Sequence, residues 1–301
     1  MILDVTSVGD VNVDVVSAKI KKMPERDSQV LVSGVGMSSG GCAANFAKAY
    51  AAFGGRARLI GKVGDDSFGK FVREELKGVD LRLSRGTRTG VTMGITFSDD
   101  SRTFLTYPGA NSELTIKDVD LRLIKGKCLH VASFFLQGLR GNTKRLIDHA
   151  HKKRMLVSFD TGWDPAGWSK ADKALVKSVL EGVDIFFPNL REGEAITGVK
   201  GEKNVGQKLL DLGPKIVVLK NGKHGAYAAS QNEFIFIPAY KVKAVDTTGA
   251  GDVFDAGFVF GRLRGWGLEK SGKFASAAAA LSTLAYGSRG YPTKKEALGL
   301  L

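Results

Sequence analysis

The chain has 301 residues, of which 43% are hydrophobic and 25% are charged, as in an ordinary folded globular protein. This composition excludes a collagen, a simple coiled coil and a wholly disordered chain. Lysine and arginine number 44 against 31 acidic residues, and the net charge of +13 indicates a surface that attracts anions or is simply well solvated. The basic residues are scattered without interleaved aromatic residues, so we expect no nucleic-acid partner.

Cysteine usage and apolar run lengths favour a cytoplasmic protein. Cys42 and Cys128 have no metal-binding spacing, and two cysteines make no disulfide framework at this size. The first ten residues contain Asp4 and lack the basic region of a signal peptide. The longest uncharged stretch, Phe274–Tyr286, is too short to span a bilayer, so we expect no membrane association.

Strand-like and helix-like runs alternate along the chain, starting with an apolar strand at Val5–Gly9. Further strands are predicted at Arg58–Val63, Cys128–Ala132, Leu156–Phe159, Ile185–Phe187 and Ile216–Leu219. Helices are predicted at Gly41–Phe53, Phe68–Leu76, Thr143–Lys152, Ala171–Leu180, Val205–Leu212, Gly251–Arg264 and Glu269–Tyr286. The alternation indicates an α/β fold with a mainly parallel sheet that is covered by helices on both faces.

Two segments, about 11–36 and 90–107, interrupt this alternation. Their short β-prone runs alternate apolar with polar residues, at Val13–Ile20, Gln29–Ser33, Val91–Phe97 and Thr103–Tyr107. We expect a small antiparallel sheet with one solvated face beside the main sheet. No linker or repeat divides the chain, so residues 1–301 are predicted to form one domain with this β insertion.

The string Asp246-Thr247-Thr248-Gly249-Ala250-Gly251-Asp252 stands directly before a predicted helix. Backbone N–H groups of a glycine-rich turn, together with the helix dipole, form an anion site that suits a phosphoryl group in transit. A carboxylate at the mouth of that site, Asp252, is placed to take a proton from a hydroxyl group. The same aspartate would also be an ordinary helix cap.

This string, continued by Val253-Phe254-Asp255-Ala256-Gly257, resembles the C-terminal signature of the ribokinase-like, or PfkB, carbohydrate kinases. The N-terminal signature is present as Gly40-Gly41-Cys42-Ala43-Ala44-Asn45, followed by residues 61–69. The resemblance runs from Gly9 to Ser288. It implies a ribokinase-like three-layer αβα fold, in which the small β-sheet is a lid over the substrate. It also implies ATP-dependent phosphoryl transfer to a sugar or polyol hydroxyl, with Mg²⁺ as cofactor.

The resemblance assigns roles residue by residue. Asp252 matches the catalytic base, and Gly249, Ala250 and Gly251 match the anion hole. Asn189 and Glu192 match an N-x-x-E motif that organises phosphates and, through water, Mg²⁺, although Asn189 would equally cap the following helix. Lys220, Gly222 and Gly225 resemble a turn near the nucleotide phosphates, and Lys220 would otherwise be solvated. Asp246 and Thr248 resemble the monovalent-cation site, for K⁺, that some members have.

At the acceptor end, the resemblance implies that Asn12, Asp14, Gly40, Gly41 and Asn45 bind the substrate. Asn111 and Gln137 are further candidates, though Asn111 is also common turn chemistry. The chain departs from ribokinase at Cys42, where lysine is frequent, and at the apolar run Phe134-Phe135-Leu136, where ribokinase presents a glutamate.

These departures leave the acceptor open between a sugar, a polyol and a nucleoside, and stacking of Phe134, Phe135 or Trp163 on a base would favour the nucleoside. A nucleotide- or nucleic-acid-binding protein without activity is the remaining alternative. The lid edge offers a surface for a homodimer, by analogy with the family.

Overall fold

The computed structural model describes residues 3–99 and 101–301. Met1 and Ile2, which belong to the segment in which no signal peptide is expected, lie outside the described residues, as does Asp100. Within the described part of the chain, no helix combines the length and apolar character needed to cross a bilayer. Cys42 and Cys128 are free thiols.

The main sheet has nine strands in the order β13-β12-β11-β10-β9-β8-β1-β4-β5. Its strands are β1 Val5–Val8, β4 Ala57–Gly64, β5 Asp80–Gly86, β8 Cys128–Val131, β9 Leu156–Phe159, β10 Ile185–Phe186, β11 Ile216–Lys220, β12 Ala226–Ala229 and β13 Phe234–Ile237. Pairing is parallel from β5 through β11, while β12 and β13 add an antiparallel edge. The predicted mainly parallel sheet is confirmed.

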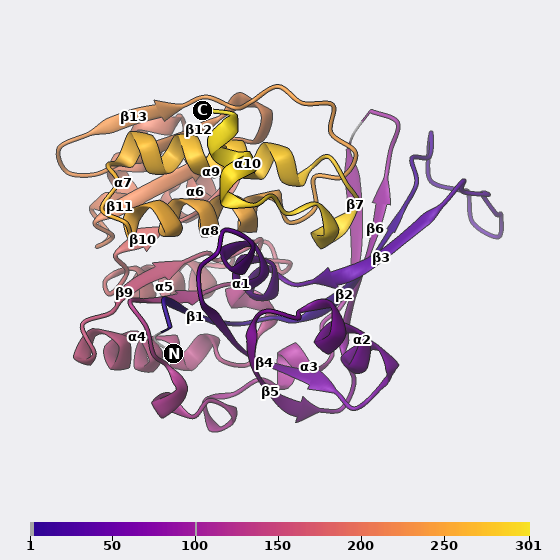
Figure 1. The fold of residues 1–301 in the computed structure, drawn as a ribbon, viewed down its shortest axis with the longest axis horizontal. Coiled ribbons are helices and arrows are strands. Elements are labelled where there is room, and N and C mark those ends of the chain that lie inside the picture. The colour runs from indigo at the N-terminus through magenta and orange to yellow at the C-terminus, as the bar shows by residue number, and fades with distance from the viewer. Residues whose placement is uncertain (1–2, 100) are drawn as a thin grey trace.

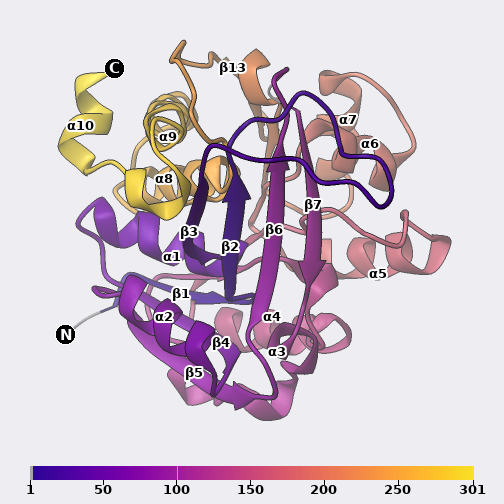
Figure 2. The same ribbon diagram turned by 90° about the vertical axis from the view of Figure 1, so that its right-hand side faces the viewer.

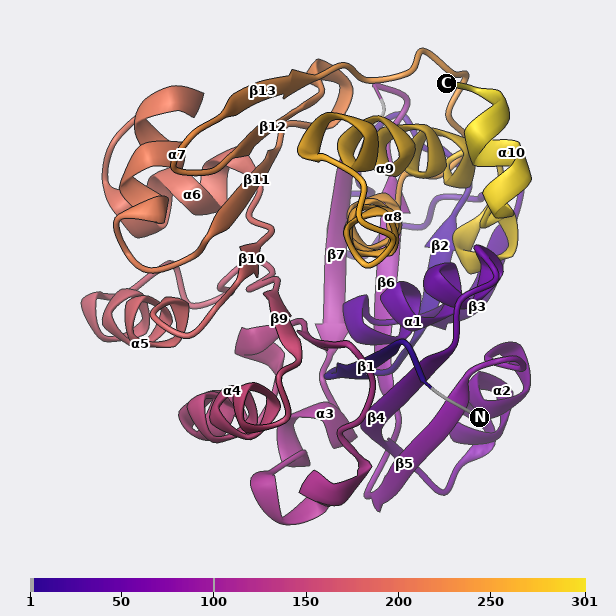
Figure 3. The ribbon, with the colours of Figure 1, turned by 60° about the vertical axis from the view of Figure 1, so that its left-hand side comes forward.

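Helices cover both faces of this sheet (Figures 1 and 3). One layer contains α1 Cys42–Ala52, α2 Ser67–Glu75, α8 Ala250–Arg262, α9 Leu268–Ser282 and α10 Lys294–Gly299. The other contains α4 Thr143–Lys152, α5 Lys170–Leu180, α6 Leu190–Thr197 and α7 Glu202–Leu210. A short helix, α3 Ala110–Glu113, follows the second sheet. The result is a three-layer αβα arrangement.

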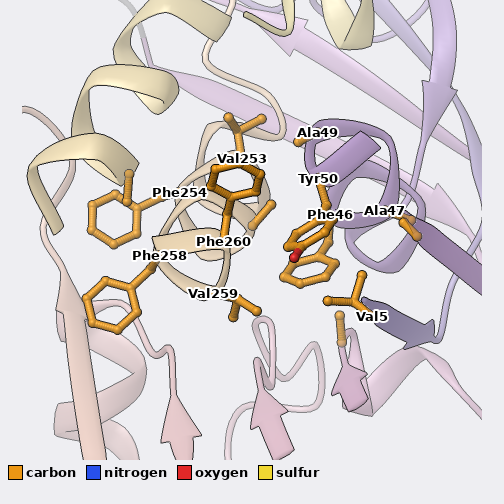
Figure 4. Close-up of a cluster of buried hydrophobic side chains, with 14 of the residues drawn as sticks. Val5, Phe46, Ala47, Ala49, Tyr50, Val253, Phe254, Phe258, Val259 and Phe260 are labelled. Carbon is orange, nitrogen blue, oxygen red and sulfur yellow. The ribbon is translucent and has the colours of Figure 1, made fainter. Parts of the chain in front are cut away.

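Successive side chains of β11 point to opposite faces of the main sheet, so this strand contributes to the apolar clusters on both faces. Val218 packs in the apolar cluster that α1, α8 and α9 cover, whereas Val217 and Leu219 pack in the cluster that α4 to α7 cover. Figure 4 shows the first cluster, in which Phe260 of α8 lies against Tyr50 of α1. This contact fixes the two helices whose N-termini carry the two signatures.

The second sheet stands beside the main sheet and has the order β3-β2-β6-β7 (Figure 2). Its strands are β2 Asn12–Ser17, β3 Val35–Gly40, β6 Gly90–Thr96 and β7 Arg102–Tyr107. The predicted small sheet therefore exists, but it is mixed rather than antiparallel, because β2 pairs in parallel with β6. A parallel pair needs no hairpin, so two segments about 75 residues apart can lie side by side.

Other sequence expectations were wrong in detail. Gln29–Ser33 is not a strand; the strand after β2 is β3, which continues past residue 36 to Gly40. The last long helix stops at Ser282 rather than Tyr286, and α10 follows it. The strands β5, β12 and β13 were not predicted. Their apolar runs are short or half exposed, so they lack the buried pattern that identifies a central strand.

Candidate active site

The N-terminus of α8 lies next to a sharp turn at Gly249. Gly249 has φ +75°, and a Cβ there would lie 2.9 Å from the Tyr291 hydroxyl oxygen, so glycine is required. Val253 is the first residue in this turn whose N–H bonds back to the Gly249 carbonyl, at 3.0 Å. The N–H groups of Gly251 and Asp252 thus belong to the helix turn that has no intrahelical acceptors. They and the helix dipole favour an anion here.

Asp252 is buried beside this turn and is held by Asn45 of α1. The Asn45 Nδ2 donates to Asp252 Oδ2 at 2.8 Å, joining the N-terminal signature to the C-terminal one. Burial and, after it, the charge of Asp160 raise the pKa of Asp252 to about 7, while the Asn45 hydrogen bond acts in the opposite direction. A carboxyl group with this pKa can accept a proton near neutral pH.

Lys220 is buried at the end of β11 and forms ion pairs with two aspartates. Its Nζ lies 2.7 Å from Asp160 Oδ2 and 3.0 Å from Asp255 Oδ1. Burial alone would lower the pKa of Lys220, but Asp160 and Asp255 outweigh it and raise that pKa. Burial also raises the pKa of Asp255 well above its usual range.

Lys220 also lies close to the helix N-terminus. A Cβ added at Gly251 would stand 3.6 Å from the Lys220 Nζ, the one neighbour within 4 Å among the described atoms outside the helix's own first turns. The ammonium group therefore adds positive charge beside the N–H groups of the turn. The sequence placed Lys220 near phosphates, and the structure places it between this turn and two carboxyl groups.

Asn189 and Glu192 form a capping box at the start of α6. Asn189 Oδ1 accepts from the Glu192 N–H at 2.9 Å, and Glu192 Oε2 accepts from the Asn189 N–H at 2.8 Å. Burial and, after it, the charge of Asp160 raise the pKa of Glu192 to about 7. The backbones of Asn189 and Lys220 pair as an isolated parallel β-bridge, and the Gly222–Gly225 turn follows that lysine. The predicted phosphate-side residues are therefore neighbours.

Asn12 and Asp14 on β2 face a buried polar region. Asn111 Nδ2 donates to Asn12 Oδ1 at 2.6 Å, and Asn111 Oδ1 accepts from the Val11 N–H. The carboxyl group of Asp14 fills the place that a Cβ at Gly40 would occupy. Burial raises the pKa of Asp14 to about 8, and Asp10 and Asp252 add to the rise.

Gly41 and Gln137 serve the backbone around this region. Gly41 caps α1 with φ +92°, where a Cβ would touch the Asp10 carbonyl. Asp10 is buried, and its Oδ1 accepts from the Ala43 N–H at 3.1 Å. The Gln137 side chain donates to the Ala132 carbonyl. That amide group is therefore engaged with the chain itself.

Asp246 fastens the loop that leads to Gly249. Its Oδ1 accepts from the Thr248 N–H and its Oδ2 from the Gly287 N–H, both at 2.9 Å. Arg102, from β7 of the small sheet, donates from Nη1 to Thr248 Oγ1 at 2.8 Å. The sequence pointed to Asp246 and Thr248, but no pattern pointed to Arg102, which contacts them across 144 residues.

Three further residues near the site were not among the predicted site residues: Asp255 and Asp160, which are buried, and Tyr291, which is partly buried. Asp255 lies three residues after Asp252 and so on the same face of α8, which is a usable signal. Asp160 follows β9, at the edge where parallel strands direct their carboxyl ends toward ligands. Tyr291 reaches the Gly249 turn from the segment before α10 and has no local signal.

The comparisons with known proteins agree with this geometry. The family model for pfkB family carbohydrate kinases matches residues 3–295. The chain is 33% identical to an ATP-dependent ribose-1-phosphate kinase of Halopiger xanaduensis, covering 96% of this chain and 95% of that protein.

Solved structures give the same fold. Ribokinase of Arabidopsis thaliana, complexed with ribose and ATP, superposes with a TM-score of 0.83 at 25% identity, over 100% of this chain and 99% of the other. A fructokinase double mutant of Vibrio cholerae, with fructose, ADP and potassium bound, has a TM-score of 0.84 at 27% identity, over 100% and 98%. These are all sugar kinases. The chain belongs to the PfkB family of carbohydrate kinases and has the ribokinase-like fold.

The buried Lys220 should be essential for stability. Replacing it in Lys220→Met leaves Asp160 without its cation, and removing one partner of a buried pair typically costs about 3–5 kcal/mol. We expect urea titration to show a loss of that size in the free energy of unfolding. The control is Lys144→Met, whose exposed pair with Glu181 should cost at most about 1 kcal/mol. Equal effects of the two variants would contradict a buried ionic centre.

Proposed function

We propose that this protein is an ATP-dependent kinase that transfers the γ-phosphoryl group to a hydroxyl of a monosaccharide or related polyol, with Asp252 as the general base. The observation that carries the proposal is the Asn45–Asp252 hydrogen bond beside the open N-terminus of α8. It unites a proton acceptor of raised pKa with an anion site, and phosphoryl transfer needs little else from a protein.

In this mechanism each group has one task. Asp252 removes the proton from the acceptor hydroxyl. The N–H groups of Gly251 and Asp252 and the positive charge of Lys220 stabilise the negative charge on the oxygens in transit, and Gly249 and Ala250 shape the turn that presents them. Asn189, Gly222 and Gly225 bind the nucleotide. Bound MgATP supplies the phosphoryl group and a cation that neutralises the charge on its phosphates.

The residues fit Mg²⁺ held mostly by phosphates and water. Among residues 3–99 and 101–301, no group of three or more His, Cys, Asp or Glu side chains is arranged to hold a metal ion. Mg²⁺ tends to keep several waters and to use one or two carboxylates with substrate phosphates. Glu192, which is buried near Lys220, would orient such waters.

The acceptor would bind between the main sheet and the small sheet, which we propose acts as a lid within a single domain. Asn12, Asp14, Gly40, Gly41 and Asn111 line this side, and Asn45 reaches both the acceptor and Asp252. The amide group of Gln137 already donates to the Ala132 carbonyl, so we propose that this residue shapes the acceptor side of the site rather than offering that donor to the acceptor. Short polar side chains around buried carboxyl groups suit a molecule with several hydroxyls.

A nucleoside acceptor is the alternative. Phe134 and Phe135 were its expected stacking partners, but both are buried and pack edge to face with Phe159 and Trp168. Of the three, only Trp163 is well exposed, at 54%. Core aromatic rings cannot also stack on a base, so two of the three expected stacking partners are lost, Trp163 alone remains, and we favour the sugar.

Coupled ADP release tests the function, with sugars, sugar phosphates, polyols and nucleosides as acceptors. With the best acceptor, Asp252→Asn should lower kcat by about 10²–10⁴ while ATP still binds, because loss of a general base has that effect. A protonated carboxyl group cannot accept a proton. The kcat/KM of the parent should therefore rise as pH increases through about 7 and fall below it.

The control for this substitution is Asp211→Asn on the surface, which should keep the parental rate. A kcat of Asp252→Asn within a few-fold of the parent would remove Asp252 as the base.

Asp14 should bind the acceptor rather than the nucleotide. Above pH 8, where Asp14 is ionised, Asp14→Ala removes a carboxylate that accepts from sugar hydroxyls, and bonds to charged groups are worth roughly 1.5–3 kcal/mol. We expect the acceptor KM to rise by about 10- to 100-fold, since 1.4 kcal/mol is a factor of ten. The KM for ATP is the internal control and should hardly change. The reverse pattern would mean that the two ends of the site are exchanged.

We also propose a homodimer through the small sheet. Its edge strands expose large apolar side chains: Val35 and Met37 on β3, and Phe104, Leu105 and Tyr107 on β7. These two strands are the opposite edges of the small sheet, and exposed apolar residues on edge strands mark interaction surfaces. Sedimentation should give a dimer that Leu105→Glu converts to a monomer, whereas Leu301→Glu at the exposed C-terminus should not. A parental protein that sediments as a monomer would contradict the proposal.

A further inference from the structure

Arg102 places a fixed positive charge against the loop that leads to the anion site. Its Nη1 lies 2.8 Å from Thr248 Oγ1 and 3.5 Å from Asp246 Oδ1. The Arg102 side chain is 21% exposed and that of Asp246 only 1%, so the pair is largely removed from water. The loop from Asp246 continues directly into Gly249 and α8.

The oxygens that face Arg102 are those that resemble a monovalent-cation site. Asp246 Oδ1 and Thr248 Oγ1 are hard oxygen ligands of the kind such ions take. Here they face a guanidinium group, while the backbone N–H groups of Thr248 and Gly287 also donate to the Asp246 carboxylate. A free cation would have to share these oxygens with a group of like charge, so with Arg102 in place the residues do not fit K⁺.

Arg102 comes from a different part of the fold than its partners. It is the first residue of β7, pairs across the small sheet with Thr96 of β6, and packs its guanidinium 5.5 Å from the centre of the Phe104 ring. Its position is thus set by the small sheet, while its charge lies against the loop that precedes α8.

We propose that Arg102 is a positioning residue that replaces a monovalent cation. Its charge holds Asp246, Thr248 and therefore the Gly249 turn in place, and the protein needs no K⁺. The inference rests on the proposed kinase function for its rate consequences only. Arg102 acts through the loop and does not itself contact the reacting atoms. In this respect the protein would differ from the Vibrio cholerae fructokinase, whose structure has potassium bound.

The experiment compares the parent and Arg102→Ala in KCl, NaCl and choline chloride at equal ionic strength. For the parent, we expect the same Tm and the same kcat in all three salts. For Arg102→Ala we expect a Tm that is higher in KCl than in the other salts, because the exposed oxygens now bind the ion. Its kcat should fall by about tenfold or more without KCl, equivalent to about 1.4 kcal/mol, and recover in part when KCl is added.

Two further variants complete the design. Arg102→Lys keeps a positive charge, should remain insensitive to K⁺, and decides the question together with the parent if Arg102→Ala does not fold. Arg122→Ala removes an arginine whose side chain is 89% exposed, and should match the parent in every salt.

A K⁺-specific gain in Tm or kcat of the parent would overturn the proposal. So would an Arg102→Ala variant with parental kcat in choline chloride, or one whose losses KCl does not relieve, since the role would then be merely structural. The Tm measurements need no acceptor. They decide the cation question even if no kinase activity is found.

Discussion

Repulsion among buried carboxyl groups is the constraint on which this site depends. Asp160 follows β9, Asp10 follows β1, and Asp252 and Asp255 share a face of α8, all near the carboxyl-terminal edge of the parallel strands. In a low-dielectric interior these groups cannot all ionise at ordinary pH. Burial is the largest cause of the raised pKa values of Asp252 and Asp255, the charge of Asp160 adds to it, and Lys220 is the largely buried cation that pairs with Asp160 and Asp255.

Lys220 divides the carboxyl groups into two kinds. Asp160, held by Lys220 and by the Gly162 N–H, has a lowered pKa although burial acts in the opposite direction. Asp252 and Asp14 lack such a partner and have raised pKa values, and Asp255 has a raised pKa as well, because its burial outweighs the effect of Lys220. Environments that separate the pKa values of neighbouring acids allow one group to remain an anion while another exchanges protons. Stability and chemistry are therefore set by the same ionic cluster.

The sequence predicted the parts of the fold that local chemistry determines. The Gly249–Asp252 turn and the Asn189–Glu192 capping box each form within four consecutive residues. The structure has the positive φ angle at Gly249 and the capping hydrogen bonds that those residues favour. The apolar strands of the main sheet were recognisable because both of their faces are buried. In contrast, β2 and β6 pair in parallel although about 75 residues separate them in the sequence. The residues of these segments alone do not distinguish this parallel pairing from two antiparallel hairpins. Arg102 and Tyr291 likewise reach the site by tertiary contacts alone.

The raised pKa values also mean that the site opposes folding as pH rises. A carboxyl group whose pKa is near 4 when unfolded and about 7 or 8 when folded stabilises the protein fully below pH 4. That contribution is lost as pH increases through the folded value, and Asp14, Asp252 and Glu192 all have this sign. A ligand with several hydroxyl donors favours the ionised carboxyl groups and so offsets part of the loss. In the proposed kinase, binding of the acceptor would therefore favour the ionised form of Asp14, while repulsion between the two carboxylates keeps the pKa of Asp252 raised. The charge arrangement that weakens the empty protein at neutral pH is thus the one that a bound ligand with hydroxyl donors would stabilise.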